Sequence, residues 1–456
     1  MPIQHYSKPG FNPYQDDEPN VEPGAWTAPL AAGPLDATMS LPGSKSLTNR
    51  ELVLAALADG TSVLHAPLHA RDSALMVHAL RNLGVEVREV EGNSPFGADF
   101  VVTPAEELLG STSIDCGLAG NVMRFVPLLA GLALGPTTFD GDAYARKRPM
   151  SGTIAALRAL GVDVAGGENG FLPFTVHGTG TIAGGRIQID ASASSQFVSG
   201  VLMAAPRFQD GVELQHVGER LPSQPHIDMT IHALAERGVI VEHSEPGLWR
   251  VAPGPIRARE VIIEADLSNA APFLAAALVT SGSVTVRNWP NHTTQVGADL
   301  LDYLPLFGAT ITRSENGNGT SDVTVTGHGH IHGVDLDLTT GGELAPVLIA
   351  LAALAETPSR FRGIAHIRHH ETDRLAALAA EIGGLGGAVV EHEDGLDLTP
   401  TKLHGGVWHS YADHRMATAG ALIGLAVDGV SIDDIACTSK TMPQFPEFWQ
   451  RMLAES

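Results

Sequence analysis

The 456-residue sequence is poor in cysteine, and this scarcity excludes two classes of protein. Cys116 and Cys437 lie far apart, and neither stands in a CxxC pair or in a Cys/His spacing typical of zinc ligands. Two such thiols do not form a disulfide framework, and no metal site is predicted. We therefore expect a protein of a reducing compartment, the cytoplasm.

Positive charge and long apolar runs are scarce as well. Lys and Arg number 28 against 51 Asp and Glu, a net charge of -23. This balance argues against nucleic acid and anionic membranes as partners. The longest apolar stretches, such as Ala345 to Ala355, are too short to span a bilayer, and the N-terminus has no apolar signal core. Residues 1–26, polar and rich in Pro, are expected to form a mobile extension.

What the sequence does have is enough apolar content for two hydrophobic cores. Hydrophobic residues make up 44% of the chain and charged residues only 17%. At this length, two domains are the natural expectation.

A short pattern recurs six times, in which an apolar helix-like run is followed by a turn residue and a β-type strand. The turn residues are separated by 75, 76, 71, 76 and 71 residues and are Gly60, Gly135, Gly211, Gly282, Pro358 and Gly429. A second pattern, a helix ending at a glycine that opens a strand, runs in step with the first. Its glycines are Gly84, Gly161, Gly238, Gly308 and Gly387, and its sixth copy is expected as a C-terminal helix around residues 445–453. Helix-glycine-strand punctuation is general in α/β proteins, but the near-constant spacing favours six repeated units in two groups of three.

Polar and charged residues stand immediately before the helices of these units. Helix N-termini offer unpaired backbone NH groups and partial positive charge, so converging termini would bind phosphate and carboxylate. Ser192, Ser268, Thr340 and Asp413, each taken singly, are most simply interpreted as ordinary N-caps. A cation at such a position is disfavoured by the helix dipole unless an anion binds there. The cations concerned are Lys45, Arg50, Arg148, Arg374, Arg415 and Lys440.

Three other motifs carry less weight. The segment 42–46 lacks the Gly-Lys pair of a nucleotide-binding P-loop. The glycines of 383–387 are expected at a helix end, not at the start that a dinucleotide loop requires. His328, His330 and His332 are expected on an exposed strand or loop and not as metal ligands.

Seven segments together resemble the 5-enolpyruvylshikimate-3-phosphate synthases. In family order they are LPGSKSLTNR (41–50), LAGNVMR (118–124), ARKRPM (145–150), SASSQF (192–197), HETDRL (370–375), YADHRM (411–416) and CTSKTMPQFPEF (437–448). The resemblance implies an α/β fold of two similar domains, each of three βαβαββ-like units, an inside-out α/β barrel of the enolpyruvyl transferase type. It implies domains at 44–265 and at 27–43 plus 266–456, with the active site in the cleft between them.

The same resemblance implies a metal-free reaction without a cofactor. The 5-hydroxyl of shikimate 3-phosphate would add to C2 of phosphoenolpyruvate while C3 is protonated, and phosphate would then leave. The implied catalytic residues are Lys45, Glu343 and Glu371. Shikimate 3-phosphate would be bound by Lys45, Ser46, Arg50, Ser194, Ser195, Gln196, Ser223, Glu343 and His370. Phosphoenolpyruvate would be bound by Lys45, Gly120, Arg148, Gln196, Arg374, Arg415 and Lys440.

Two roles for Glu371 stay open at this point. It is either an acid/base residue or one half of an i,i+3 ion pair with Arg374. Several positions also depart from the commonest family pattern: Leu118, Asn121, Tyr144, Glu343, His366 and His370. A neutral His370 in place of lysine would weaken the hold on the sugar phosphate at high pH. Gly120 is the residue of glyphosate-sensitive members, so inhibition is expected, with its potency left open by Asn121 and Phe125.

Three other functions compete with the one that the resemblance implies. An enolpyruvyl transferase acting on UDP-N-acetylglucosamine would share the fold but uses a loop cysteine, which the stretch from Asp142 to Arg148 lacks. A non-catalytic phospho-metabolite sensor would have no need of Glu343 and Glu371. An RNA-end-processing enzyme conflicts with the acidic composition. The expected protein is a monomer that binds two phosphorylated small molecules.

Overall fold

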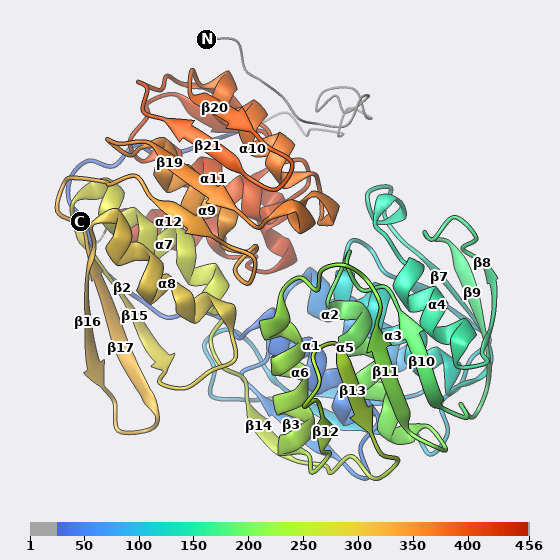
Figure 1. The fold of residues 1–456 in the computed structure, drawn as a ribbon. Coiled ribbons are helices and arrows are strands. Elements are labelled where there is room, and N and C mark those ends of the chain that lie inside the picture. Colours follow the sequence, from blue (N-terminus) through green and yellow to red (C-terminus); the bar gives the residue numbers. More distant parts are fainter. Residues whose placement is uncertain (1–24, 455–456) are drawn as a thin grey trace. The chain divides into compact units, whose positions relative to one another are not determined.

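A computed structural model describes residues 25–454 of the chain (Figure 1). The predicted mobile extension, residues 1–26, lies outside the described residues except for its last two. Of these, Trp26 belongs to strand β1 (Trp26–Thr27), which pairs antiparallel with β23 (Val430–Ile432). Every helix in the described range is too short or too polar to cross a membrane.

The chain divides into two compact units. The inserted unit comprises Pro42–Glu264, and the terminal unit comprises the residues up to Leu41 together with those from Ala265 onward.

The inserted unit contains three four-stranded mixed sheets of the same topology (Figure 1). In each, the first two strands are parallel and the other two add antiparallel, which is the βαβαββ order. The first has strand order β14 (Glu260–Ile262), β3 (Ser62–His65), β5 (Asp99–Thr103), β4 (Glu86–Val90), with helices α1 (Lys45–Ala56) and α2 (Arg71–Asn82). The second has order β6 (Thr112–Asp115), β7 (Leu134–Asp140), β9 (Phe174–Thr179), β8 (Asp163–Gly166), with α3 (Gly120–Gly131) and α4 (Ser151–Ala159). The third has order β10 (Gly185–Ile189), β11 (Val212–His216), β13 (Leu248–Val251), β12 (Val241–Glu242), with α5 (Gln196–Ala204) and α6 (Gln224–Glu236).

In the terminal unit two sheets repeat this topology and the last has one strand fewer. Its first sheet has order β16 (Thr310–Glu315), β17 (Thr320–Thr326), β15 (Ser283–Pro290), β2 (Asp36–Met39), with α7 (Leu267–Thr280) and α8 (Leu300–Tyr303). The next has order β18 (Asp335–Asp337), β19 (Ser359–Arg362), β21 (Leu396–Thr399), β20 (Ala388–Glu391), with α9 (Ala345–Ala353) and α10 (Arg374–Gly384). The last has three strands, β1, β23 and β22 (Gly406–Trp408), with α11 (His414–Gly424) and α12 (Phe445–Ala454).

Two strands are placed by pairing and not by chain order. Strand β2 directly precedes α1 in sequence, yet it pairs in parallel with β15 of the terminal unit. The corresponding position beside β3 is taken by β14, which comes from the far end of the inserted unit. The chain therefore completes one sheet of each unit with a strand distant in sequence.

The first helix of each repeat is buried on nearly all sides. All twelve residues of α3 are buried, as are thirteen of the fourteen in α7. A helix that is apolar all round is stable only inside a core, so these helices run through the centre of each unit with the sheets outside them. This is the inside-out α/β arrangement that the sequence predicts, and the prediction of six similar units is confirmed.

Two units depart from the regular repeat. In the fifth unit Gly387 directly precedes β20, as predicted, but the left-handed conformation after the helix, with φ +87°, belongs to Gly386. In the fourth unit the second helix is broken into the four residues of α8 between two 3-10 turns, because Pro305 cannot continue a helical hydrogen-bond ladder.

Candidate active site

In the terminal unit, polar residues at the starts of α7, α9, α10 and α11 are joined by hydrogen bonds. Arg374 is the first residue of α10, Arg415 the second of α11, and Glu343 stands two residues before α9. Three of these helices, α7, α9 and α11, are the first helices of their repeats. Each follows a strand or turn, so the polar residues gather at the N-terminal ends of the helices.

Arg374 is the centre of a buried ion-pair network. Its Nε and Nη2 atoms donate to the two carboxylate oxygens of Asp413, at 2.7 and 3.0 Å. Nη2 also donates to Glu371 at 2.9 Å, and the ammonium of Lys440 contacts the other oxygen of Glu371. Burial by itself lowers the pKa of Arg374, but the charges of Asp413 and Glu371 outweigh it, so the pKa is raised. The guanidinium is therefore a permanent cation at this site.

His370 is attached to the same network. Its Nδ1 atom lies 3.0 Å from Nη1 of Arg374. A guanidinium group only donates, so Nδ1 is the acceptor in this contact.

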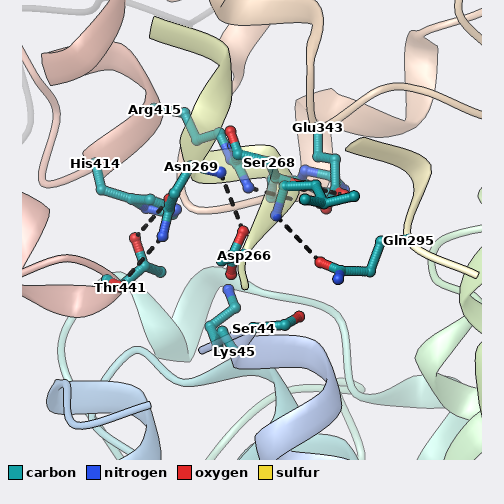
Figure 2. Close-up of polar contacts among 12 residues, drawn as sticks. Ser44, Lys45, Asp266, Ser268, Asn269, Gln295, Glu343, His414, Arg415 and Thr441 are labelled. Carbon is teal, nitrogen blue, oxygen red and sulfur yellow. Dashed lines mark hydrogen bonds and ion pairs between the residues drawn. The ribbon is translucent and has the colours of Figure 1, made fainter. Parts of the chain in front are cut away.

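Glu343 is held by Ser268 and Arg415 (Figure 2). The hydroxyl of Ser268 donates to Oε1 of Glu343 at 2.6 Å, and Nη2 of Arg415 lies 4.0 Å from Oε2. Arg415 also donates to the backbone oxygen of Ser268 at 3.1 Å. The side chain of Glu343 keeps about a fifth of its surface exposed, so this carboxylate is the accessible one of the pair Glu343 and Glu371.

The start of α7 is fixed from several sides, as Figure 2 shows. Asp266 caps the helix by accepting the backbone NH of Asn269 at 3.0 Å, and Asn269 donates to the backbone oxygen of Thr441. Gln295 accepts the backbone NH of Leu267 and donates to the oxygen of Ala265. Ser268, the residue that carries Glu343, is thus positioned by a rigid turn.

The buried cations of this unit have carboxylate partners of their own. Arg374, Arg415 and Lys440 are each less than 8% exposed, and Asp413, Glu371 and Glu343 face them. In this unit the negative charge that such cations need comes from these carboxylates. A bound anion would compete with the carboxylates for the same cations.

In the inserted unit, Lys45 and Arg50 lie one turn and a half apart on α1. Nζ of Lys45 is 3.7 Å from the buried carboxylate of Asp72. Arg50 donates to Thr230 at 2.8 Å and to the backbone oxygens of Ser46 and His226. Its position was predicted at the helix end and is instead inside the helix, since α1 begins at Lys45.

Gly120, at the start of α3, faces a compact polar cluster. A Cβ atom there would lie 2.8 Å from Nη1 of Arg124, 3.0 Å from Nη2 of Arg148 and 3.1 Å from Oε1 of Gln196. Arg148 donates to the backbone oxygen of Leu118, and Arg124 donates to Gln196 at 3.4 Å. Two guanidinium groups and an amide therefore surround the start of a buried helix, a setting that suits an anion.

The remaining predicted residues of this unit occupy helix starts. Ser194 accepts the backbone NH of Gln196 at 3.3 Å, and the buried Ser195 immediately precedes α5. Ser223 precedes α6 in a left-handed conformation, with φ +52°.

The predicted residues divide between the two units. The terminal unit contains Glu343, His370, Glu371, Arg374, Arg415 and Lys440, and the inserted unit contains Lys45, Ser46, Arg50, Gly120, Arg148, Ser194, Ser195, Gln196 and Ser223. The i,i+3 ion pair between Glu371 and Arg374 is present.

Of the four presumed N-caps, only Asp413 caps its helix. It accepts the backbone NH of Arg415 and also holds Arg374. Ser268 was taken for a cap and is instead the donor to Glu343, while α5 and α9 have no side-chain cap from Ser192 or Thr340. Asp72, Arg124 and Gln295 were missed. Only Arg124 lay within a quoted motif.

Among residues 25–454, no three His, Cys, Asp or Glu side chains gather as metal ligands would. Both cysteines are free, and burial raises the pKa of each thiol, which keeps it from reacting as a thiolate.

The chain matches the family model described as EPSP synthase (3-phosphoshikimate 1-carboxyvinyltransferase) over residues 30–449. A 3-phosphoshikimate 1-carboxyvinyltransferase of Kocuria rhizophila is 51% identical over 449 residues, covering 97% of this chain and 98% of that protein.

Two solved structures share the fold. The EPSP synthase of Acinetobacter baumannii has a TM-score of 0.73 at 22% identity, covering 94% of this chain and 97% of that one. The enolpyruvyl transferase NikO of Streptomyces tendae has a TM-score of 0.72 at 17% identity, covering 93% and 96%.

Proposed function

The chain belongs to the EPSP synthase family, and from that premise we propose which of its residues bind the substrates and carry the reaction. It is an enzyme, a transferase of the shikimate pathway. The enzyme transfers the enolpyruvyl group of phosphoenolpyruvate to the 5-hydroxyl of shikimate 3-phosphate and releases phosphate.

Phosphoenolpyruvate carries a phosphate and a carboxylate, and both need cations. We assign its binding to Arg374, Arg415 and Lys440 of the terminal unit and to Lys45, Gly120, Arg148 and Gln196 of the inserted unit. The observation that carries the proposal is the cluster of buried cations beside Glu343 and Glu371. Planar guanidinium groups suit bidentate binding of phosphate and carboxylate.

Glu343 takes the proton of the 5-hydroxyl as the oxygen attacks C2 of phosphoenolpyruvate. Its carboxylate is partly exposed, and the hydroxyl of Ser268 at 2.6 Å fixes its orientation. A general base must lie within hydrogen-bond reach of the proton that it removes, and a fixed rotamer favours that geometry.

Glu371 and Lys45 serve the proton transfers at the methylene carbon, C3. Without substrate, Glu371 is bound by Arg374 and Lys440. An anionic substrate that engages these two cations competes with Glu371 and frees its carboxylate for proton transfer. The i,i+3 ion pair and the acid/base role are therefore successive states of one residue.

Shikimate 3-phosphate is assigned to Lys45, Ser46, Arg50, Ser194, Ser195, Gln196 and Ser223, with Glu343 and His370 at its ring. The hydroxyl-bearing residues adjoin helix starts, whose backbone NH groups favour a phosphate. We further propose that the enzyme acts as a cytoplasmic monomer, without metal or cofactor, and that glyphosate inhibits it.

The first experiment measures phosphate release from purified protein supplied with phosphoenolpyruvate and one of two acceptors. Release with shikimate 3-phosphate and not with UDP-N-acetylglucosamine is expected. Release with neither acceptor, in protein that gives a folded circular-dichroism spectrum, would overturn the proposal and favour a phospho-metabolite sensor.

The role of Glu343 is tested by Glu343→Gln, which keeps the hydrogen bond from Ser268 but cannot accept the proton. Turnover should fall at least 100-fold, in line with the usual contribution of general base catalysis. The control is Glu356→Gln in the same unit, where the carboxylate is exposed and pairs with the exposed His330. Full turnover by Glu343→Gln would refute the assignment.

A further inference from the structure

The turn that leads into α11 is strained. Tyr411 and Ala412 both have φ +54°, a left-handed conformation that is costly for residues other than glycine. Two such residues in succession persist only where the surroundings enforce them. No glycine relieves the turn, so neighbouring contacts must hold it.

One buried carboxylate supplies most of those contacts. Glu381, on α10, is 2% exposed and accepts the hydroxyl of Tyr411. It also accepts the backbone NH of His409 at 2.9 Å and lies 3.2 Å from Nδ1 of the same histidine. The backbone NH of Ser410, which lies between His409 and Tyr411 in sequence, donates to the carboxylate of Asp433 at 2.8 Å.

The strained turn positions two residues that are proposed to bind phosphoenolpyruvate, Arg374 and Arg415. Asp413 follows Ala412 directly and holds Arg374 through both carboxylate oxygens. It also accepts the NH of Arg415, the second residue of α11. A change of φ at Tyr411 or Ala412 would rotate Asp413 and would move both guanidinium groups with it.

We infer that Glu381 is a positioning residue for phosphoenolpyruvate binding, which acts through the hydroxyl of Tyr411 to hold the strained turn that places Arg374 and Arg415. Glu381 contacts neither guanidinium group in the described residues. Its effect is indirect, and it deepens the proposed function, on which it depends.

Comparing the KM values for the two substrates distinguishes this positioning role from a general effect on stability. In Tyr411→Phe the ring stays and only the hydroxyl is lost. We expect KM for phosphoenolpyruvate to rise about tenfold, while KM for shikimate 3-phosphate and kcat change less than twofold. Glu381→Gln should show the same split, because the amide cannot accept both the hydroxyl and the NH of His409.

A double variant tests whether the two residues act as one unit. If the hydroxyl works only through Glu381, the Tyr411→Phe, Glu381→Gln double variant binds phosphoenolpyruvate no more weakly than Glu381→Gln alone. The control is Ser321→Ala on β17, which removes a buried hydroxyl bonded to Asn291 at 2.6 Å, far from the turn in sequence. Its KM values should match those of the wild type.

Two results would overturn the inference. One is an unchanged KM for phosphoenolpyruvate in Tyr411→Phe. The other is an equal loss in both KM values and in kcat, which would show a structural role only. Wild-type turnover is measured first, and its absence would count against the proposed function and not against the role of Glu381.

Discussion

At Gly120, in the inserted unit, an added side chain would interfere with the polar cluster around the start of α3. A Cβ atom would press on the guanidinium groups of Arg124 and Arg148 and on the amide of Gln196. These are flexible side-chain ends, so they would shift and the helix would survive.

Gly120→Ala is therefore expected to raise KM for phosphoenolpyruvate about tenfold with little effect on the melting temperature. Steady-state kinetics and thermal denaturation check this. Gly254→Ala is a suitable control, because nothing lies within 4 Å of its Cβ position in the same unit. An unchanged KM in Gly120→Ala would contradict the assignment of this cluster to phosphoenolpyruvate.

Arg374 and Asp413 form a pair whose disruption leaves a buried charge. Asp413 is fully buried, and Arg374 is its bidentate partner. Removing one member of such a pair typically costs about 3–5 kcal/mol.

Arg374→Gln should lower the free energy of unfolding by about that amount, as urea denaturation would measure. The matched variant is Arg360→Gln, which breaks an exposed pair with Asp397 and should cost less than about 1 kcal/mol. Equal losses in the two variants would show that burial does not govern the Arg374 pair.

For individual residues, the cations of the site could be predicted from the sequence, but most of the residues that contact them could not. Lys45 and Arg374 stand in recognisable motifs at helix starts, where a cation needs an explanation. Lys440 was also predicted at a helix start, but this was wrong: it is the last residue of a 3-10 helix, Ile435–Lys440. Asp72 and Gln295 stand in no motif, and only folding brings them to Lys45 and to α7. Ser268 was taken for a cap because serine is common there, and the donor role depends on Glu343, 75 residues away.

Among the elements, the turn before α11 has a titratable group on its surface. The hydrogen bond from His409 to the carboxylate of Glu381 raises the pKa of the histidine above its usual value, and the charges of Glu381 and Asp433 add to the shift while burial opposes it. The groups facing the ring are Glu381 from α10, Asp433 from the loop after β23, and the ring of Tyr411. A raised pKa in the folded state stabilises the protein at low pH, and this contribution is lost as the pH rises through that pKa.

His409→Ala should therefore lose more stability at pH 6 than at pH 8. The difference is expected to stay below about 1 kcal/mol, since the side chain is partly exposed. Urea midpoints at the two pH values measure it, with the exposed His243→Ala as control. A larger loss at pH 8 would reverse the sign and refute the argument.

Elements were predictable where the repeat is regular. Five helix-ending glycines recur at near-constant spacing, and four of them, Gly84, Gly161, Gly238 and Gly308, adopt positive φ. The fifth unit offers two consecutive glycines, Gly386 and Gly387, and the sequence does not say which one turns. The short α8 shows a conflict between the apolar pattern and Pro305, in which the proline prevails.

For the whole molecule, the mechanism proposed above needs no metal. The carboxylates of Asp413, Glu343 and Glu371 are paired with Arg374, Arg415 and Lys440. Dialysis against EDTA should leave phosphate release within twofold of the untreated rate, and inductively coupled plasma analysis would verify that metal is removed. A tenfold loss that is restored by one divalent metal would contradict the metal-free mechanism.

The sixfold architecture followed from spacing, but strand pairing did not. Parallel pairing of β2 with β15, or of β14 with β3, joins segments with no common sequence signal. Both exchanges depend on the tertiary fold, in which each buried helix requires a sheet to cover it.

The exchange of β2 and β14 sets an order of events for a chain emerging from the ribosome. Strand β2 is made early, but its partner strand β15 begins only at Ser283, and β1 must wait for Val430–Ile432. At about 5–20 residues per second, this delay is on the order of tens of seconds. The inserted unit, closed by β14, has all of its strands by Ile262 and can fold during that time. In the nascent protein the inserted unit is therefore complete before the terminal unit, although the terminal unit contains the first strands to be made. Until their partners are synthesised, β1 and β2 are unpaired strands that need protection from aggregation.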